Sequence, residues 1–186
     1  MRVLVLGASG FIGKRIVLKA PEHIELTGTY FKNEIKNEQG HFEHLNYLDE
    51  ELDWKQIIEP YSCIIVAARA NAENGIERDN ISQRSQAAFV KMIKAVKESR
   101  LKPFIIALNG SLTYGNRGEE LVRTDDEINP VGFAKSYSIA EKPFRDYLAQ
   151  HNEIAIVRAP WVLGPGSWFS QIYLEANKIP IIGKGK

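Results

Sequence analysis

The residues that point most directly to chemistry are three glycines near the start of the chain, in the segment GASGFIG at residues 7–13. This segment follows the apolar run Val3 to Leu6 and precedes a stretch of helical periodicity. Glycines between a strand and a helix let the pyrophosphate of a dinucleotide approach the backbone, where amides at the start of the helix donate to it. We therefore predict dinucleotide binding, with free N–H groups of Ala8 to Ile12 facing the phosphates. The contacting residues would be Gly7, Ala8, Ser9, Gly10, Phe11, Ile12 and Gly13. A tight strand-to-helix turn without a ligand is the alternative.

The end of the second expected strand, in LTGTYFKNE, bears on which dinucleotide would bind. An acidic residue there accepts hydrogen bonds from the ribose hydroxyls and repels a 2′-phosphate, whereas a basic residue does the reverse. Tyr30 and Lys32 come first, and no acidic residue appears before Glu34. This order favours NADP over NAD, with Lys32 as the partner of the phosphate. An ordinary solvated loop lysine is an equally good interpretation of Lys32.

The elements expected around the glycine loop alternate between buried strands and amphipathic helices. Apolar runs predict strands over residues 3–6, 24–30, 63–68, 104–108 and 154–158, and helical spacing predicts helices from about residue 11 and over 49–60, 80–100 and 132–150. Parallel strands need crossover connections, which cover the sheet. The sequence predicts an α/β fold with a doubly wound, mostly parallel sheet, a Rossmann-type NAD(P)-binding domain over residues 1–186. Pro143 inside the last helix predicts a break or kink near Ala140.

The charge balance and the cysteine content indicate which partners and which cellular compartment to expect. The 24 Lys and Arg residues against 23 Asp and Glu residues give a net charge of +1, which does not favour a nucleic acid or an anionic membrane as partner. The single cysteine, Cys63, lies in an apolar run and is expected to be a buried small hydrophobe. We expect a soluble, cytoplasmic protein.

His41 and His44 are expected in a solvated loop and not in a metal site, because the sequence offers no third ligand at a suitable spacing.

Several segments together are similar to those of a known family. They are GASGFIG, IIVAARA at residues 64–70, LTYG at 112–115, FAKSYSIAE at 133–141 and VRAPWVLGPG at 157–166. In this order the chain resembles the NAD-dependent epimerase/dehydratase family, the extended short-chain dehydrogenases/reductases. The resemblance implies that Ala67, Ala68 and Arg69 wall the cofactor and that Asn46 lies near the adenine. It also implies that Pro160, Trp161 and Val162 pass beside the nicotinamide.

The resemblance fails at the residues that would do the chemistry. The family uses a tyrosine, a lysine four residues later and a serine or threonine from the preceding loop; these positions hold Phe133, Tyr137 and Gly110. Phe133 has no ionisable proton, and Tyr137 carries no positive charge. A shifted register does not restore the pair, because no lysine in the sequence has a tyrosine four residues before it. Phe133 and Tyr137 are instead expected to line the nicotinamide side.

Three other hydroxyl groups are weak catalytic candidates: those of Ser111, Tyr114 and Tyr137. Each has an ordinary structural interpretation, a turn serine for the first and aromatic side chains at the edge of the core for the others. Glu141 is expected to cap or pair on the surface.

Three functions are compatible with these residues. The first is an NAD(P)-dependent oxidoreductase or epimerase acting on a sugar-nucleotide-like molecule, and the second is a non-catalytic NADP(H)-binding or sensing module. The third, a cofactor-free structural subunit, leaves the glycine loop unexplained.

The family's substrate lobe usually begins where this chain stops, so we expect a C-terminal lobe to be missing after Lys186. The helices starting near Asn80 and Gly132 are the candidates for a homodimer interface.

Overall fold

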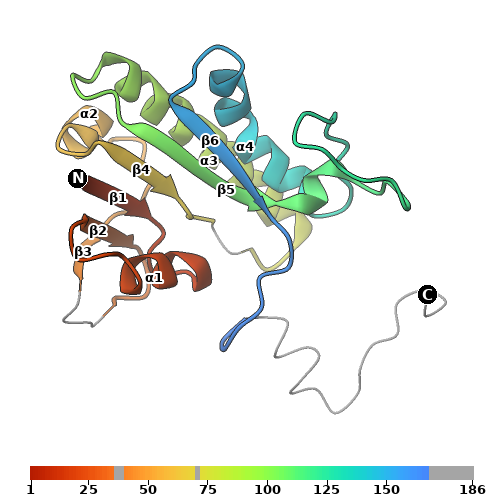
Figure 1. Cartoon of the computed structure of the whole chain (residues 1–186), viewed down its shortest axis with the longest axis horizontal. Helices are drawn as coiled ribbons and strands as arrows, with labels where there is room; N and C mark the ends of the chain where they lie inside the picture. The colour runs from red at the N-terminus through yellow and green to blue at the C-terminus, as the bar shows by residue number, and fades with distance from the viewer. Residues whose placement is uncertain (36–39, 70–71, 168–186) are drawn as a thin grey trace.

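The structure, a computed structural model, describes residues 1–35, 40–69 and 72–167. Its strands are β1 Arg2–Leu6, β2 Glu25–Tyr30, β3 His41–His44, β4 Cys63–Val66, β5 Phe104–Gly110 and β6 Ile154–Ala159. They form one sheet in the order β3-β2-β1-β4-β5-β6, with every neighbouring pair parallel (Figure 1). This is the strand order of dinucleotide-binding domains. The predicted doubly wound Rossmann-type fold is confirmed.

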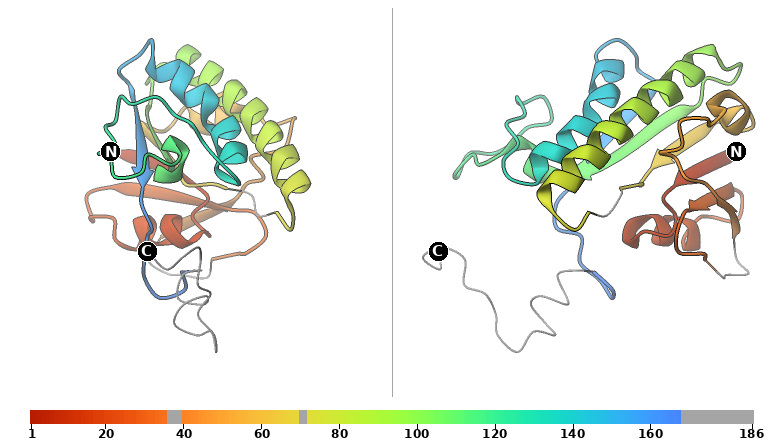
Figure 2. Two further views of the ribbon diagram at one scale, coloured as in Figure 1. Left: turned by 90° about the vertical axis from the view of Figure 1, so that its right-hand side faces the viewer. Right: turned by 180° about the vertical axis from the view of Figure 1, so that it is seen from behind.

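Helices cover both faces of the sheet. They are α1 Phe11–Leu18, α2 Trp54–Ile58, α3 Gly75–Glu98 and α4 Ala134–Leu148, with a short 3-10 helix at Ser111–Tyr114. Alternate side chains of β1 divide the interior: Leu4 and Leu6 belong to the larger core with α2, α3 and α4, and Val3 and Val5 to the smaller core with Val17 of α1. Figure 2 shows α3 and α4 packed side by side on the face opposite α1.

The connections out of β1 and β3 create the place where a ligand is expected. After β1 the chain passes through α1 to β2 on one side, whereas β3 leads through α2 to β4 on the other side of β1. Ligands of open α/β sheets bind at such a reversal, outside the carboxyl ends of the strands. The carboxyl ends of β1 and β4 therefore define the candidate site.

The expectation of a solvated loop at His41 and His44 is wrong, because these residues bound a strand. β3 pairs in parallel with β2, with Phe42 opposite Gly28. The ring of Phe42 packs against the smaller core, and both histidines are exposed. A four-residue strand with one apolar side chain carries no alternation that a sequence pattern could reveal.

Of the break or kink predicted near Ala140, the break is wrong, because α4 runs without interruption through Pro143. Proline removes the amide that would donate to the carbonyl four residues earlier, here that of Ile139. In the same turn the Arg145 side chain donates to the Ser138 carbonyl, at 3.1 Å. Pro143 and Phe144 are buried, so tertiary packing of this helix outweighs the cost of the proline.

Side-chain caps set the starts of α3 and α2. The Asn74 side chain accepts a hydrogen bond from the Glu77 amide at 2.9 Å, so α3 begins five residues earlier than periodicity indicates. The Asp53 carboxylate accepts from the Gln56 amide at 3.1 Å, and α2 is a single short helix within the predicted range 49–60.

Candidate functional site

The glycine loop between β1 and α1 packs too tightly for side chains. Gly7 has a φ of +84°, and a Cβ there would lie 2.5 Å from the Ala68 Cα. A Cβ on Gly13 would collide with the Gly7 carbonyl oxygen. Gly7 thus brings the end of β1 against the end of β4, and Gly13 lets α1 start directly over the turn.

The amides of this loop are only partly available to a ligand. The Ala8 amide donates to the Thr29 carbonyl at 2.8 Å, and the Gly10 amide donates to the Gly7 carbonyl at 3.0 Å. The expectation that all amides from Ala8 to Ile12 are free is therefore wrong for these two. Those of Ser9, Phe11 and Ile12 have no hydrogen-bond partner among residues 1–35, 40–69 and 72–167. The last two open α1, at the positive end of its dipole.

The residues expected at the adenine side lie near the carboxyl ends of β2 and β3. Tyr30 meets His44 edge to face at 5.7 Å between ring centroids, and Lys32 is exposed. The Asn46 Oδ1 accepts from the Leu48 amide at 3.2 Å, so this oxygen is occupied by its own turn. From the sequence, His44 was considered only as a metal ligand and not as a neighbour of Tyr30, because β3 itself was not predicted.

The cofactor-wall residues after β4 meet the start of α4. The Ala67 amide donates to the Leu6 carbonyl at 2.9 Å, which extends the β1–β4 contact past Val66. The Arg69 guanidinium stacks over the Tyr137 ring, with 4.3 Å between the Arg69 Cζ and the ring centroid. Tyr137 in turn meets Phe133 edge to face at 5.9 Å. The structure thus brings Arg69, Tyr137 and Phe133 together, and we call them the Arg69 cluster.

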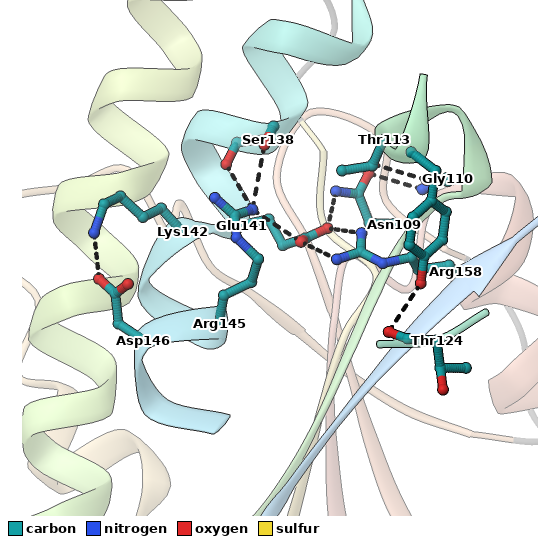
Figure 3. Close-up of polar contacts among 11 residues, drawn as sticks. Asn109, Gly110, Thr113, Thr124, Ser138, Glu141, Lys142, Arg145, Asp146 and Arg158 are labelled. Carbon is teal, nitrogen blue, oxygen red and sulfur yellow. Dashed lines mark hydrogen bonds and ion pairs between the residues drawn. The ribbon is translucent and has the colours of Figure 1, made fainter. Parts of the chain in front are cut away.

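The hydroxyl candidates after β5 differ in availability. Tyr114 is buried, and its hydroxyl donates to the Thr124 carbonyl at 3.2 Å (Figure 3). Ser111 is partly exposed at the start of the 3-10 helix, and a Cβ on Gly110 would meet nothing within 4 Å. The Tyr114 hydroxyl is held in a structural hydrogen bond, while the space beside Gly110 would accept a serine side chain.

Glu141 was expected on the surface, which is wrong: its side chain is only 3% exposed. Its carboxylate accepts two hydrogen bonds from Arg158 of β6 at 2.7 Å each and one from Arg145 at 2.9 Å; Asn109 of β5 donates a fourth (Figure 3). Burial raises the pKa of Glu141, but the hydrogen bonds from Arg158, Arg145 and Asn109 outweigh it and hold the pKa below its ordinary value. The carboxylate is charged and fastens α4 to the ends of β5 and β6.

The ionic cluster of Glu141, Arg145 and Arg158 is linked through Asn109 to Gly110, at the carboxyl end of β5. Asn109 precedes Gly110, and its Oδ1 accepts from the Gly110 amide at 2.8 Å. The Arg158 guanidinium stacks on the Tyr114 ring, 5.0 Å from the centroid. A glutamate eight residues after Phe133 lies about 80° around the helix from it, and the arginine in VRAPW was visible in the sequence. Only the fold shows that they meet.

The segment after β6 turns back toward α1. Pro160, Trp161 and Val162 are exposed. Farther along, the Arg15 guanidinium donates to the Pro165 carbonyl at 2.6 Å and to the Phe11 carbonyl at 3.2 Å. The stretch that follows these three residues is therefore tied to the first turn of α1 at Pro165.

Cys63 is buried as predicted, and burial raises the pKa of its thiol. In the described part of the chain, no three His, Cys, Asp or Glu side chains are grouped to hold a metal ion. None of the helices described above is both long and apolar enough to cross a membrane.

Solved structures with this fold include several enzymes of nucleotide-sugar metabolism. UDP-glucuronic acid 4-epimerase from Bacillus cereus, in complex with NAD, superposes with a TM-score of 0.75 at 19% identity, covering 92% of this chain and 60% of that one. A hypothetical dTDP-4-dehydrorhamnose reductase from Sulfolobus tokodaii gives 0.69 at 21% identity, covering 86% and 56%. UDP-N-acetylglucosamine 4-epimerase from Methanobrevibacter ruminantium M1 gives 0.69 at 18% identity, covering 84% and 54%. The chain spans about 60% or less of the length of these proteins.

No curated protein matches the chain in sequence. The model of the NAD dependent epimerase/dehydratase family, in contrast, matches residues 3–183, nearly the whole chain. That match agrees with the strand order and with the glycine loop described above, and it confirms the resemblance stated from the sequence. The chain belongs to the NAD-dependent epimerase/dehydratase family.

Proposed function

We propose that this chain is the NAD(P)-binding domain of a protein similar to nucleotide-sugar epimerases, dehydratases and reductases, with a non-standard reactive centre. The observation that supports cofactor binding best is the glycine loop. Gly7 and Gly13 bring backbone atoms into contact where any side chain would collide, and the Phe11 and Ile12 amides have no partner among the described residues. Unsatisfied amides at a helix N-terminus suit a pyrophosphate.

The remaining cofactor contacts follow from the same edge of the sheet. The amides of Phe11 and Ile12 would hold the pyrophosphate, and Tyr30 and Lys32 would flank the adenine ribose. The exposed Lys32 ammonium supports the preference for NADP, because it could pair with a 2′-phosphate. Bound nicotinamide would supply hydride transfer, while the chain orients it and excludes water.

The reactive centre is where the proposal departs from the family pattern. Phe133 can neither donate nor accept a proton, Gly110 has no hydroxyl, and the buried Tyr114 hydroxyl is engaged with the Thr124 carbonyl. The hydroxyls of Ser111 and Tyr137 remain as candidates for proton transfer to a sugar-nucleotide alcohol or carbonyl. The same residues favour the second candidate, a non-catalytic NADP(H)-binding or sensing module.

Cofactor titration followed by a turnover assay separates these functions. NADH and NADPH are titrated by fluorescence, and hydride exchange is then followed with a panel of sugar nucleotides. Turnover that is lost in Ser111→Ala or Tyr137→Phe, and kept in Phe133→Ala, supports the enzyme. Cofactor binding without turnover, together with turnover gained by Gly110→Ser, Phe133→Tyr and Tyr137→Lys combined, supports the binding module. Failure to bind either dinucleotide rejects both.

We further propose a cytoplasmic, soluble protein whose partners are the dinucleotide and a sugar-nucleotide-like small molecule. The near-neutral net charge of +1 is the reason for proposing no nucleic-acid and no membrane partner. A homodimer formed through α3 and α4, and a substrate lobe after residue 186, belong to the same proposal. Sedimentation of the full chain at several concentrations tests the dimer.

A further inference from the structure

Arg69 is an exposed arginine that lies next to the glycine loop. It directly follows Ala68, whose Cα lies against Gly7, so it sits at the carboxyl end of β4 beside the glycine loop. Its guanidinium is nevertheless directed to Tyr137 of α4, 4.3 Å above the ring. The guanidinium thus contacts α4, and α4 packs on the face of the sheet opposite α1.

The contact with Tyr137 holds the Arg69 guanidinium over one face of the ring. A guanidinium carries five N–H donors in a planar fork that matches an oxyanion, and it can keep these donors while it lies over an aromatic ring. Arg69 is exposed, and it makes no ion pair with a residue of 1–35, 40–69 or 72–167. Its donors therefore have no carboxylate partner within the described chain.

The acidic side chains of the neighbouring helix are engaged elsewhere. Glu77 of α3 accepts a hydrogen bond from the Glu73 amide at 2.7 Å. Asp79 accepts a hydrogen bond from the Ser136 hydroxyl, next to Tyr137 in α4. Neither carboxylate forms an ion pair with Arg69.

A second positive charge lies at the same edge of the sheet. The single carboxylate of Glu141 is shared by Arg145 and Arg158, so this buried cluster carries a net charge of +1. Asn109 connects it to the backbone of Gly110, which faces open space. Together with Arg69, the cluster places positively charged groups near the carboxyl ends of β4, β5 and β6, where they can attract an anionic ligand.

We propose that Arg69 is a substrate-binding residue that takes an oxyanion of the sugar nucleotide, a carboxylate on the sugar or its diphosphate, in a forked hydrogen bond across the Tyr137 ring. This inference rests on the proposed function and assigns Arg69 to the substrate instead of the cofactor. A charge-assisted forked pair strengthens binding by roughly 10- to 100-fold.

The test uses two ligands that differ only in the sugar substituent, UDP-glucuronate and UDP-glucose. Their dissociation constants are measured by calorimetry on the full chain with saturating NADPH or NADH, for the wild type, Arg69→Gln and Arg69→Lys. The matched control is Arg100→Gln, an exposed arginine between α3 and β5 at the opposite edge of the sheet. Dinucleotide titration of each variant is done first, so that failure of the proposed function is seen separately.

Two outcomes support the proposal and distinguish the two anions. A loss of about 10- to 100-fold for UDP-glucuronate only, in Arg69→Gln, assigns the sugar carboxylate, and an equal loss for both ligands assigns the diphosphate. Arg69→Lys is expected to recover part of the affinity, because it keeps the charge without the fork. The proposal is overturned if Arg69→Gln changes neither ligand, if it weakens the dinucleotide instead, or if the wild type with bound dinucleotide takes up neither sugar nucleotide.

Discussion

Replacing Glu141 by glutamine tests how the candidate site is held together. The carboxylate accepts two hydrogen bonds from Arg158 at 2.7 Å and one from Arg145 at 2.9 Å, and Asn109 donates a further one. Glutamine keeps the volume of the side chain but removes the charge that both guanidinium groups share. Arg145 and Arg158 are 26% and 13% exposed, so neither is fully solvated when it loses its partner.

The magnitude follows from the burial of these groups. Removing one partner of a buried ion pair costs about 3–5 kcal/mol, because an uncompensated charge is left behind. Glutamine can still accept one hydrogen bond through its amide oxygen, so about 3 kcal/mol is expected. Since a domain is stable by only about 5–15 kcal/mol, a loss of this size is easily measured.

The same helix supplies a matched control. Lys142 and Asp146 form an ion pair of 2.6 Å with the same i,i+4 spacing as Glu141 and Arg145, but their side chains are 54% and 59% exposed (Figure 3). Asp146→Asn should cost no more than about 0.5 kcal/mol, because solvent screens exposed pairs. Urea denaturation at pH 7 measures both variants. Equal losses for Glu141→Gln and Asp146→Asn would refute the assignment of a buried, shared carboxylate.

Acid titration gives an independent readout of the same group. The folded-state pKa of Glu141 lies below its ordinary value of 4.5, so the carboxylate contributes stability above that pH and loses it as the pH falls through the folded-state pKa. The wild type should therefore lose unfolding free energy below about pH 4.5 more steeply than Glu141→Gln. Parallel curves for the two proteins would contradict the lowered pKa.

Three further substitutions or treatments have definite expected outcomes. Gly13→Ala should destabilise the fold by more than about 1 kcal/mol and weaken dinucleotide binding, because its Cβ would strike the Gly7 carbonyl; Gly13→Ala with unchanged melting and binding would contradict this. Gly110→Ser should leave the melting temperature within about 2 °C of the wild type, since its Cβ meets nothing within 4 Å, and a larger drop would show that the space is filled. Cys63 should resist alkylation at pH 8 until denaturant is added, because burial raises the pKa of its thiol; rapid labelling of the native protein would disagree.

Local patterns were enough to predict most of the fold. Each of the strands β1, β4, β5 and β6 is an apolar run. The glycine motif at residues 7–13 indicates dinucleotide binding because an expected strand precedes it and an expected helix follows it. The four residues His41–His44 form a strand only because β2 offers an open edge and Phe42 fills a space against Gly28. No window of the sequence contains that information.

The candidate site was predicted less completely, because its details depend on contacts between distant segments. The Ala8 amide is taken by Thr29, 21 positions along the chain, so the loop sequence alone cannot show that this donor is occupied. Glu141 and Arg158 come from a helix and a strand whose relative placement is set by the sheet. Arg69 was expected to wall the cofactor, and its stacking on Tyr137 appears only when β4 and α4 are packed together.

Arg15 connects the first turn of α1, next to the glycine loop, to the segment that follows β6. One guanidinium bridges the Phe11 carbonyl in the first turn of α1 and the Pro165 carbonyl after β6, and a Cβ added to Gly164 would lie 3.5 Å from the Phe11 ring. A ligand that orders the first turn of α1 therefore favours this contact, and by thermodynamic reciprocity whatever holds Pro165 in the contact favours the same ligand. Two parts of the chain separated by 150 positions are thus expected to be coupled in ligand binding.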